Sequence, residues 1–250
     1  MKKIITKVML CLAMAGGSLL HAQSGPTPYP DAKDDAAWPG RGPIRVFGWM
    51  SQNRDYFWTQ RDKAQSAVVF TGDSLVGNWK HPAMAAAFPG LKVVNRGIGG
   101  DVTRGLLFRF KEDVLDLNPK AIVICIGTND LSAHADPEAI IGNIGLILDQ
   151  ARAHDAAMPV VLCTIPPRAN PKAPLEHADS VTDLNQRIVA LAKGRDHVIV
   201  FNLFSALADD AGKPRPEYFN PDLLHPRPAG YERWASLLAP VLASLKLATP

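Results

Sequence analysis

Four short segments of the chain carry groups that ester hydrolysis requires. Gly72-Asp73-Ser74-Leu75 follows an apolar run and offers a serine hydroxyl as nucleophile. Gly97-Ile98-Gly99-Gly100-Asp101 and Gly127-Thr128-Asn129-Asp130 offer N–H donors for an oxyanion. Asp222-Leu223-Leu224-His225 supplies an imidazole base and a carboxylate. Each segment is ambiguous alone, since serine is also common in turns and Asp-x-x-His arises by chance. Together they predict a serine esterase.

Asp222 and His225 suit the roles of orienting carboxylate and base. If the segment that they share forms a turn, the carboxylate can hold the imidazole from the side, which fixes its tautomer and stabilises the imidazolium. His225 would then take the proton of Ser74 and later give it to the leaving alcohol. The predicted catalytic residues are therefore Ser74, Asp222 and His225.

The glycine-rich segment and the asparagine segment each follow an apolar run. Residues 97–101 also precede a helical segment, so their backbone N–H groups lie where partial positive charge accumulates. Asn129 can direct its side-chain amide into the same site. A dinucleotide-binding motif and an α/β-hydrolase nucleophile elbow are each disfavoured by one residue. Val102 stands where a dinucleotide-binding motif needs its third glycine, and Val76 stands where the α/β-hydrolase elbow needs its last glycine.

The elements that must position these segments alternate along the chain. Continuous apolar runs, typical of strands covered on both faces, occur at 67–70, 91–94, 121–126, 160–164 and 198–201. Helical segments are expected at 82–88, 102–117, 137–154, 179–193 and 228–247. This alternation predicts an α/β fold, a three-layer α/β/α sandwich with five parallel strands, in which the serine lies at the carboxyl end of a strand.

The order of the four segments resembles the SGNH branch of the GDSL esterase/lipase family, whose signature residues are Ser, Gly, Asn and His. The resemblance runs from about residue 68 to the final helix. It implies a flavodoxin-like fold, no metal or other cofactor, and an oxyanion hole formed by the N–H groups of Ser74 and Gly100 and the side chain of Asn129. Within the family, the stretch 97–104 looks most like bacterial relatives of platelet-activating-factor acetylhydrolase catalytic subunits.

Three further residues are candidate substrate contacts. Trp79, five residues after Ser74, could line a pocket, and packing explains it equally well. Arg104 and Arg168 flank the expected cleft and could bind a polar acyl acceptor, although a surface ion pair is the simpler role for each. Asp73 is expected to cap backbone N–H groups rather than to act in catalysis.

Residues 1–22 read as a secretory signal peptide, with a basic start, an apolar run and cleavage near Ala22. The mature protein is therefore expected to be secreted or periplasmic, without stable membrane insertion. Of 27 Lys+Arg and 24 Asp+Glu, the first 22 residues hold three lysines and no acid, so the remainder is formally neutral. This balance gives no reason to expect a nucleic-acid partner.

At 250 residues the chain can form one substantial domain. Residues 23–65 are expected to form an extended lead-in and an aromatic cover, and residues 66–250 the hydrolase domain. The aromatic residues of 45–63 are expected to pack on the core, with the wall of a substrate cleft as the alternative. Cys125 and Cys163 lie in apolar runs and are expected to be buried free thiols, with a disulfide as the alternative.

The expected substrate is a short-acyl ester, small or polymeric, and the favoured one is an O-acetylated carbohydrate, which suits an exported neutral enzyme without an extended hydrophobic lid. This preference rests on family analogy. A lysophospholipase or thioesterase is the alternative among enzymes. A carbohydrate- or lipid-binding module that kept the fold without the chemistry is the alternative from another class. The sequence leaves the oligomeric state open.

Overall fold

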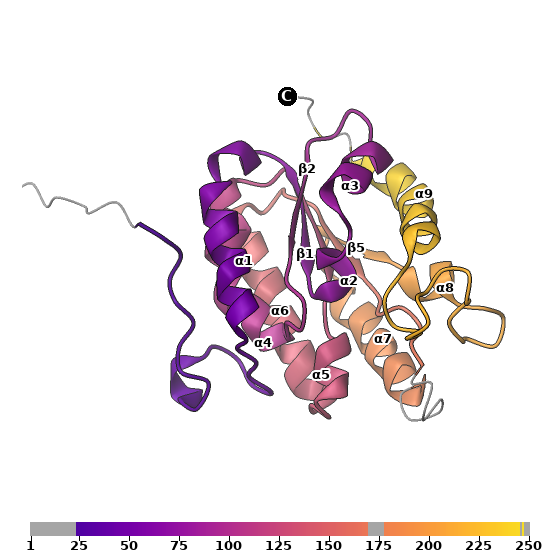
Figure 1. The fold of residues 1–250 in the computed structure, drawn as a ribbon, viewed down its shortest axis with the longest axis horizontal. Coiled ribbons are helices and arrows are strands. Elements are labelled where there is room, and N and C mark those ends of the chain that lie inside the picture. The colour runs from indigo at the N-terminus through magenta and orange to yellow at the C-terminus, as the bar shows by residue number, and fades with distance from the viewer. Residues whose placement is uncertain (1–23, 170–177, 246, 248–250) are drawn as a thin grey trace, which may run out of the picture.

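A five-stranded parallel sheet forms the centre of the computed structural model, which describes residues 24–169, 178–245 and 247. The strands are β1 (Val68–Gly72), β2 (Val93–Gly97), β3 (Ala121–Cys125), β4 (Val160–Cys163) and β5 (Val198–Phe201). They lie in the order β2-β1-β3-β4-β5, the flavodoxin-like order, with helices on both faces (Figure 1). The expected α/β/α sandwich is thus confirmed. The expected signal peptide, residues 1–22, lies outside the described residues.

The long helices fall close to where the sequence predicts them. The helices are α1 (Gly48–Thr59), α2 (Ser74–Gly77), α3 (His81–Ala87), α4 (Thr103–Asp113), α5 (Thr128–Ser132), α6 (Pro137–His154), α7 (Ala178–Ala192), α8 (Leu203–Leu207) and α9 (Pro228–Ser244), with short 3-10 turns at Asp35–Ala37, Asp62–Ala64 and Leu115–Leu117. The single helix expected over 102–117 ends early, because Val114 leaves the helical region at φ −126° and Asn118 is left-handed at φ 46°.

Strand β2 differs most from its prediction. The sequence favours 91–94, whereas the strand runs from Val93 to Gly97 and includes two polar residues. The Asn95 side chain donates to Val76 O at 2.7 Å and to Trp79 O at 3.0 Å. Because tertiary partners satisfy the Asn95 side chain inside the strand, an apolar pattern could not reveal where the strand ends.

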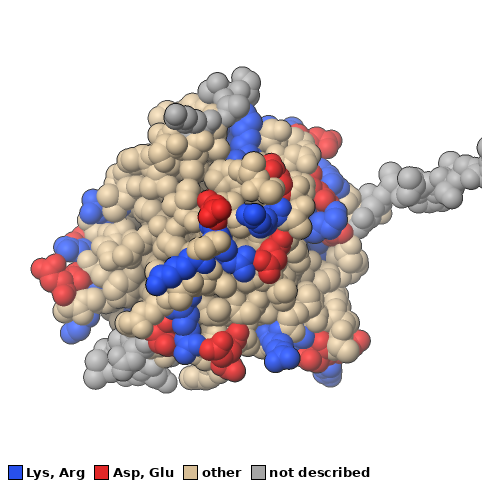
Figure 2. Space-filling model, turned by 180° about the vertical axis from the view of Figure 1, so that it is seen from behind, with Lys and Arg blue, Asp and Glu red and all other residues tan. Residues whose placement is uncertain are grey.

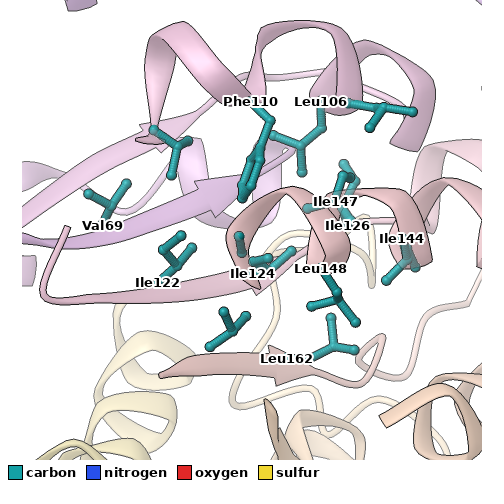
Figure 3. Close-up of a cluster of buried hydrophobic side chains, with 14 of the residues drawn as sticks. Val69, Leu106, Phe110, Ile122, Ile124, Ile126, Ile144, Ile147, Leu148 and Leu162 are labelled. Atoms are coloured by element: carbon teal, nitrogen blue, oxygen red, sulfur yellow. The ribbon is translucent and has the colours of Figure 1, made fainter. Parts of the chain in front are cut away.

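Alternate side chains of the strands enter two separate apolar layers. On one face, Val69 and Ile124 pack with residues of α4, α6 and α7 (Figure 3). On the other face, Phe70 and Val123 pack with residues of α3, α8 and α9. This two-sided burial explains why the strands read as continuous apolar runs. Cys125 and Cys163 belong to the second layer and are free thiols, as expected.

The segment ahead of β1 is tied to α4 by buried arginines. Arg104, on α4, is 2% exposed and pairs with Asp35 of the lead-in, Nη1 to Oδ1 at 2.5 Å. Arg54, on α1, is also 2% exposed and pairs with Glu112 at 2.7 Å and with Asp113 at 3.2 Å. The described part of the lead-in and α1 therefore pack on the same side of the sheet as α4 (Figure 1).

The outer surface carries charges of both signs. On the face shown in Figure 2, Lys and Arg side chains alternate with Asp and Glu, and neither sign forms a large patch of its own. This mixture accords with the balanced charge of the sequence. Among the described residues, every helix falls short of the length and apolarity that crossing a bilayer requires.

A fully buried arginine joins the ends of two strands. Arg109, from α4, donates through Nη2 to Gly72 O at 3.0 Å and through Nη1 to Arg96 O at 2.9 Å. Its Nε donates to Asp101 Oδ2 at 2.8 Å. The guanidinium thereby satisfies the last carbonyl of β1 and a carbonyl near the end of β2, and it fixes the glycine turn that follows β2.

We predict that Arg109→Met lowers the free energy of unfolding by about 3–5 kcal/mol, because the buried Asp101 carboxylate loses its ion-pair partner and the buried Asp113 carboxylate is left with Arg54. Urea unfolding followed by circular dichroism measures the change. Lys111→Met on the same helix is the matched control. Lys111 is exposed and pairs with Asp116 at the surface, so its removal should leave the midpoint unchanged. Equal midpoints for the Arg109 variant and the wild type would contradict this role.

Candidate active site

Ser74 lies at the carboxyl end of β1, as the first residue of α2. The turn depends on Gly72, whose φ is +146° and where a Cβ would lie 1.8 Å from the carbonyl oxygen of Cys125. Asp73 caps α2, since its Oδ1 accepts from the Leu75 N–H at 2.9 Å, which is the structural role expected for it. The Tyr231 hydroxyl donates to Leu75 O at 3.0 Å, so α9 also holds the short helix in place.

The structure brings Ser74, His225 and Asp222 into one hydrogen-bonded row. Ser74 Oγ lies 2.9 Å from His225 Nε2, and His225 Nδ1 lies 2.7 Å from Asp222 Oδ2. A carboxylate beside Nδ1 favours the tautomer protonated there, which leaves Nε2 free to accept the serine proton. Ser74 follows β1, whereas Asp222 and His225 lie in the loop before α9. Ser74 and His225 are 151 positions apart in the chain.

Asp222 is held by more than the imidazole. Its Oδ1 accepts from the backbone N–H groups of Leu224 and His225, each at 3.0 Å. Burial alone would raise the pKa of the Asp222 carboxyl, but these hydrogen bonds and the one from the His225 ring outweigh burial and lower it. The carboxylate is therefore ionised at neutral pH and fixed relative to the ring.

The glycine turn and Asn129 lie beside the serine. A Cβ on Gly99 would lie 3.8 Å from Ser74 Cβ, and Gly100 has a φ of +84°. Asn129, at the start of α5, donates through Nδ2 to Asp101 O at 2.9 Å. Asp130 accepts from the Thr103 N–H at 3.0 Å, which ties α5 to the start of α4. The three segments thus meet at one edge of the sheet.

Arg45 of the lead-in and Trp49 of α1 reach the same edge. The sequence analysis gives Arg45 no role, and for the aromatic residues it favours core packing over a substrate cleft. Arg45 Nη1 donates to Asn129 Oδ1 at 3.2 Å, and Trp49 Nε1 donates to Gly99 O at 2.9 Å. A Cβ on Gly100 would lie 3.4 Å from the Phe47 ring. The aromatic content of 45–63 was the available signal, but it could not show which part of the fold these side chains contact.

Each of the three candidate substrate contacts has structural partners. Trp79 is 2% exposed and stacks on Tyr231 in the core, with ring centroids 4.9 Å apart, so packing is its role. Arg104 is neither a surface residue nor part of the site, because the lead-in surrounds it. Arg168 is half-buried and donates to Thr128 O at 2.5 Å and to Ser132 Oγ at 2.9 Å, so it braces α5. Burial lowers the pKa of its guanidinium.

Comparison with known proteins identifies the family to which the chain belongs. The sequence pattern of the GDSL-like lipase/acylhydrolase family matches residues 59–233. The chain belongs to this family. Membership confirms the expected resemblance and class, a carboxylic ester hydrolase of the GDSL type. The matched region begins at the last residue of α1, so most of α1 and all of the lead-in lie ahead of it.

Relatives of this GDSL-type chain include acetylhydrolases and lipases. It is 30% identical over 162 residues to subunit alpha2 of human platelet-activating factor acetylhydrolase IB, a match that covers 64% of this chain and 66% of the relative. A GDSL-like lipase from Bacteroides thetaiotaomicron is 27% identical, with a TM-score of 0.64, over 73% of this chain and 90% of that one. Acetylxylan esterase Axe2 from Geobacillus stearothermophilus shares the fold, at 19% identity and a TM-score of 0.58, over 74% and 97%.

No group of three or more potential metal ligands occurs among the residues that the structure describes. Several polar side chains of the site bond to one another. Ser74, His225 and Asp222 form the row, and Asp130 bonds to Thr103. The geometry of this GDSL-type site is thus that of a nucleophile, a base and an orienting carboxylate beside N–H donors.

The Asp73 carboxyl of the site has a strongly raised pKa. It is fully buried, and its Oδ2 has no hydrogen-bond partner among the described residues. Burial raises its pKa from 3.8 to about 8, against the opposing effect of the Leu75 N–H. Because the folded-state pKa lies above the unfolded value, the folded state holds a proton that the unfolded chain has released. Stability from this group therefore falls as pH rises from about 4 to about 8 and then levels off.

We predict that Asp73→Asn, which keeps the capping oxygen and cannot ionise, gains stability over the wild type as pH rises. The gain is at most about 1.4 kcal/mol per pH unit and ends near pH 8. Urea unfolding of both proteins from pH 5 to 9 measures it. Asp136→Asn is the control, because Asp136 is an exposed cap of α6 and its difference from the wild type should be flat. A flat difference for Asp73→Asn as well would refute a buried, protonated Asp73.

Proposed function

We propose that this chain is an exported serine esterase that hydrolyses short-acyl esters, with O-acetyl groups on carbohydrate as its natural substrate. The observation that carries the proposal is the row of Ser74, His225 and Asp222, with contacts of 2.9 Å and 2.7 Å, at the edge of the sheet where the glycine turn and Asn129 also lie. Export rests on the signal-like composition of residues 1–22.

The proposed reaction has two halves. Ser74 Oγ attacks the carbonyl carbon while His225 Nε2 takes its proton, and His225 then gives that proton to the leaving alcohol. This leaves an acyl ester on Ser74. Water activated by His225 attacks the acyl carbon, and His225 returns a proton to Ser74 Oγ as the carboxylic acid leaves. Asp222 holds the ring and stabilises its charged form at both stages.

The oxyanion is proposed to bind the N–H groups of Ser74 and Gly100 and the side-chain amide of Asn129. An amide nitrogen carries two hydrogens, and Asp101 O accepts one of those on Asn129 Nδ2. Among the described residues nothing accepts the second hydrogen, and we assign it to the oxyanion. Arg45 acts through Asn129. It donates to Oδ1, and this hydrogen bond fixes the orientation of the amide, with Oδ1 toward Arg45 and Nδ2 toward Asp101 O. Arg45 is thus a positioning residue.

The substrate proposal draws on the relatives' names as well. The human relative is an acetylhydrolase and the Geobacillus neighbour an acetylxylan esterase, so the acetyl ester is the feature that the two names share. The lipid-directed alternative, a lysophospholipase or thioesterase, predicts activity that rises with acyl length, whereas this proposal predicts a sharp preference for acetyl. Turnover measured across a series of 4-nitrophenyl esters separates the two.

We predict that Ser74→Ala lowers kcat on 4-nitrophenyl acetate at least about a thousandfold and abolishes labelling by a fluorophosphonate probe. Asp222→Asn should lower kcat on the order of 10⁴-fold, because the ring loses its orientation and tautomer. Ser236→Ala, a surface serine on α9, is the control and should react like the wild type. Undiminished turnover by Ser74→Ala would end the mechanism, and an unlabelled, inactive wild type would favour a binding module.

A double-mutant cycle tests Arg45. We predict that Asn129→Ala lowers kcat on the same ester about 10²–10³-fold and that Arg45→Met lowers it about tenfold. Because Arg45 acts through Asn129, the double variant should be no slower than Asn129→Ala. Arg41→Met, an exposed arginine of the same segment, is the matched control. Additive losses in the double variant would show that Arg45 acts on the rate by another route.

A further inference from the structure

Two aromatic side chains at the start of α1, the N-cap residue Phe47 and Trp49, are stacked on each other and exposed. Phe47 and Trp49 lie with ring centroids 4.5 Å apart and planes inclined by 16°. Phe47 is 39% exposed and Trp49 49% exposed. Large aromatic rings are usually well buried, and most rings of this chain are, including Trp38, Phe57 and Trp79. The folding of the core therefore does not account for this pair.

The pair is fixed against the turn beside the nucleophile. The indole N–H of Trp49 donates to Gly99 O at 2.9 Å, and Gly99 is the residue whose Cβ would lie 3.8 Å from Ser74 Cβ. The Phe47 ring packs against Gly100, and Met50 beneath it is fully buried. One edge of the pair is thus anchored while part of its surface stays open to solvent, which is a preorganised surface for a ligand.

We propose that the Phe47/Trp49 pair is the subsite for the sugar ring of the acyl acceptor. The proposal rests on the esterase function proposed above and deepens it. The C–H face of a pyranose is flat and weakly positive, so it stacks on an aromatic face, whose centre is negative. Since Gly99 already takes the indole N–H, the faces and free edges of the rings remain for the ligand. A sugar stacked there lies next to Ser74, so its ester carbonyl can reach the hydroxyl.

An acyl chain or a lipid fits this surface less well. Ligands that bind mainly through apolar contact need a concave site that encloses most of their surface. Two cavities among the described residues have volumes of about 610 and 340 Å³, and neither of these two is lined by Ser74, His225, Phe47 or Trp49. A partly exposed pair beside the nucleophile instead matches a ring that is held on one face and solvated on the other.

The test compares two acetyl esters that differ in their acceptor. Glucose pentaacetate carries a pyranose ring, whereas vinyl acetate carries no ring that could stack. We expect Phe47→Ala and Trp49→Ala each to lower the ratio of kcat/KM on the sugar ester to kcat/KM on vinyl acetate about tenfold, mainly through KM. Trp49→Phe keeps a ring and should restore most of the ratio.

Tyr56→Ala is the matched control, because Tyr56 is a 61% exposed aromatic residue of the same helix that contacts neither glycine of the turn. Its ratio should equal that of the wild type. An equal fall on both esters in the Phe47 and Trp49 variants, or an unchanged ratio, would overturn the subsite. So would a change of sedimentation coefficient that accompanies the kinetic loss, since the pair would then be a contact between copies of the chain. A wild type inactive on both esters would instead reject the proposed esterase function.

Discussion

One buried guanidinium sets the geometry on which the candidate site depends. Arg109 bonds to carbonyls at the ends of β1 and β2 and to the Asp101 carboxylate in the turn between β2 and α4. Strand ends leave carbonyl groups that need donors, and a planar cation with five N–H groups can serve several at fixed angles. Asp101 O in turn accepts from Asn129. The positions of Ser74, the glycine turn and the asparagine amide are therefore linked through one side chain.

The sequence predicts the architecture well because the sheet is covered on both faces. Strand β3, with all five residues buried, is apolar throughout, and its run stands out against the helices around it. The motifs Gly72-Asp73-Ser74-Leu75 and Asp222-Leu223-Leu224-His225 were also informative, since parallel strands bring their carboxyl ends to one edge. The meeting of Ser74 with His225 follows from topology and motif order together.

Contacts that depend on tertiary partners could not be read from the chain. Arg104 and Arg168 looked like surface cations, yet carbonyl oxygens and short polar side chains surround them. Trp79 stands close to Ser74 in sequence, but the turn of α2 directs it into the core. Arg45 belongs to none of the sequence motifs that indicate the site. Its contact with Asn129 joins residues 84 positions apart, and neither composition nor periodicity records such a pairing.

The way the lead-in is attached bears on what it can do. Its arginine contacts are directional, since Arg104 bonds to Asp35, Pro39 O and Gly42 O, and Arg54 bonds to Thr27 O and Glu112. Apolar packing alone tolerates sliding, whereas a guanidinium satisfied by several named oxygens fixes the register of the segment. Residues 24–58 lie ahead of the family's matched region. Held in register, they can carry side chains such as Arg45 and Trp49 to defined atoms of the site. Variation in that segment can thus alter what binds beside Ser74 while the catalytic row stays the same.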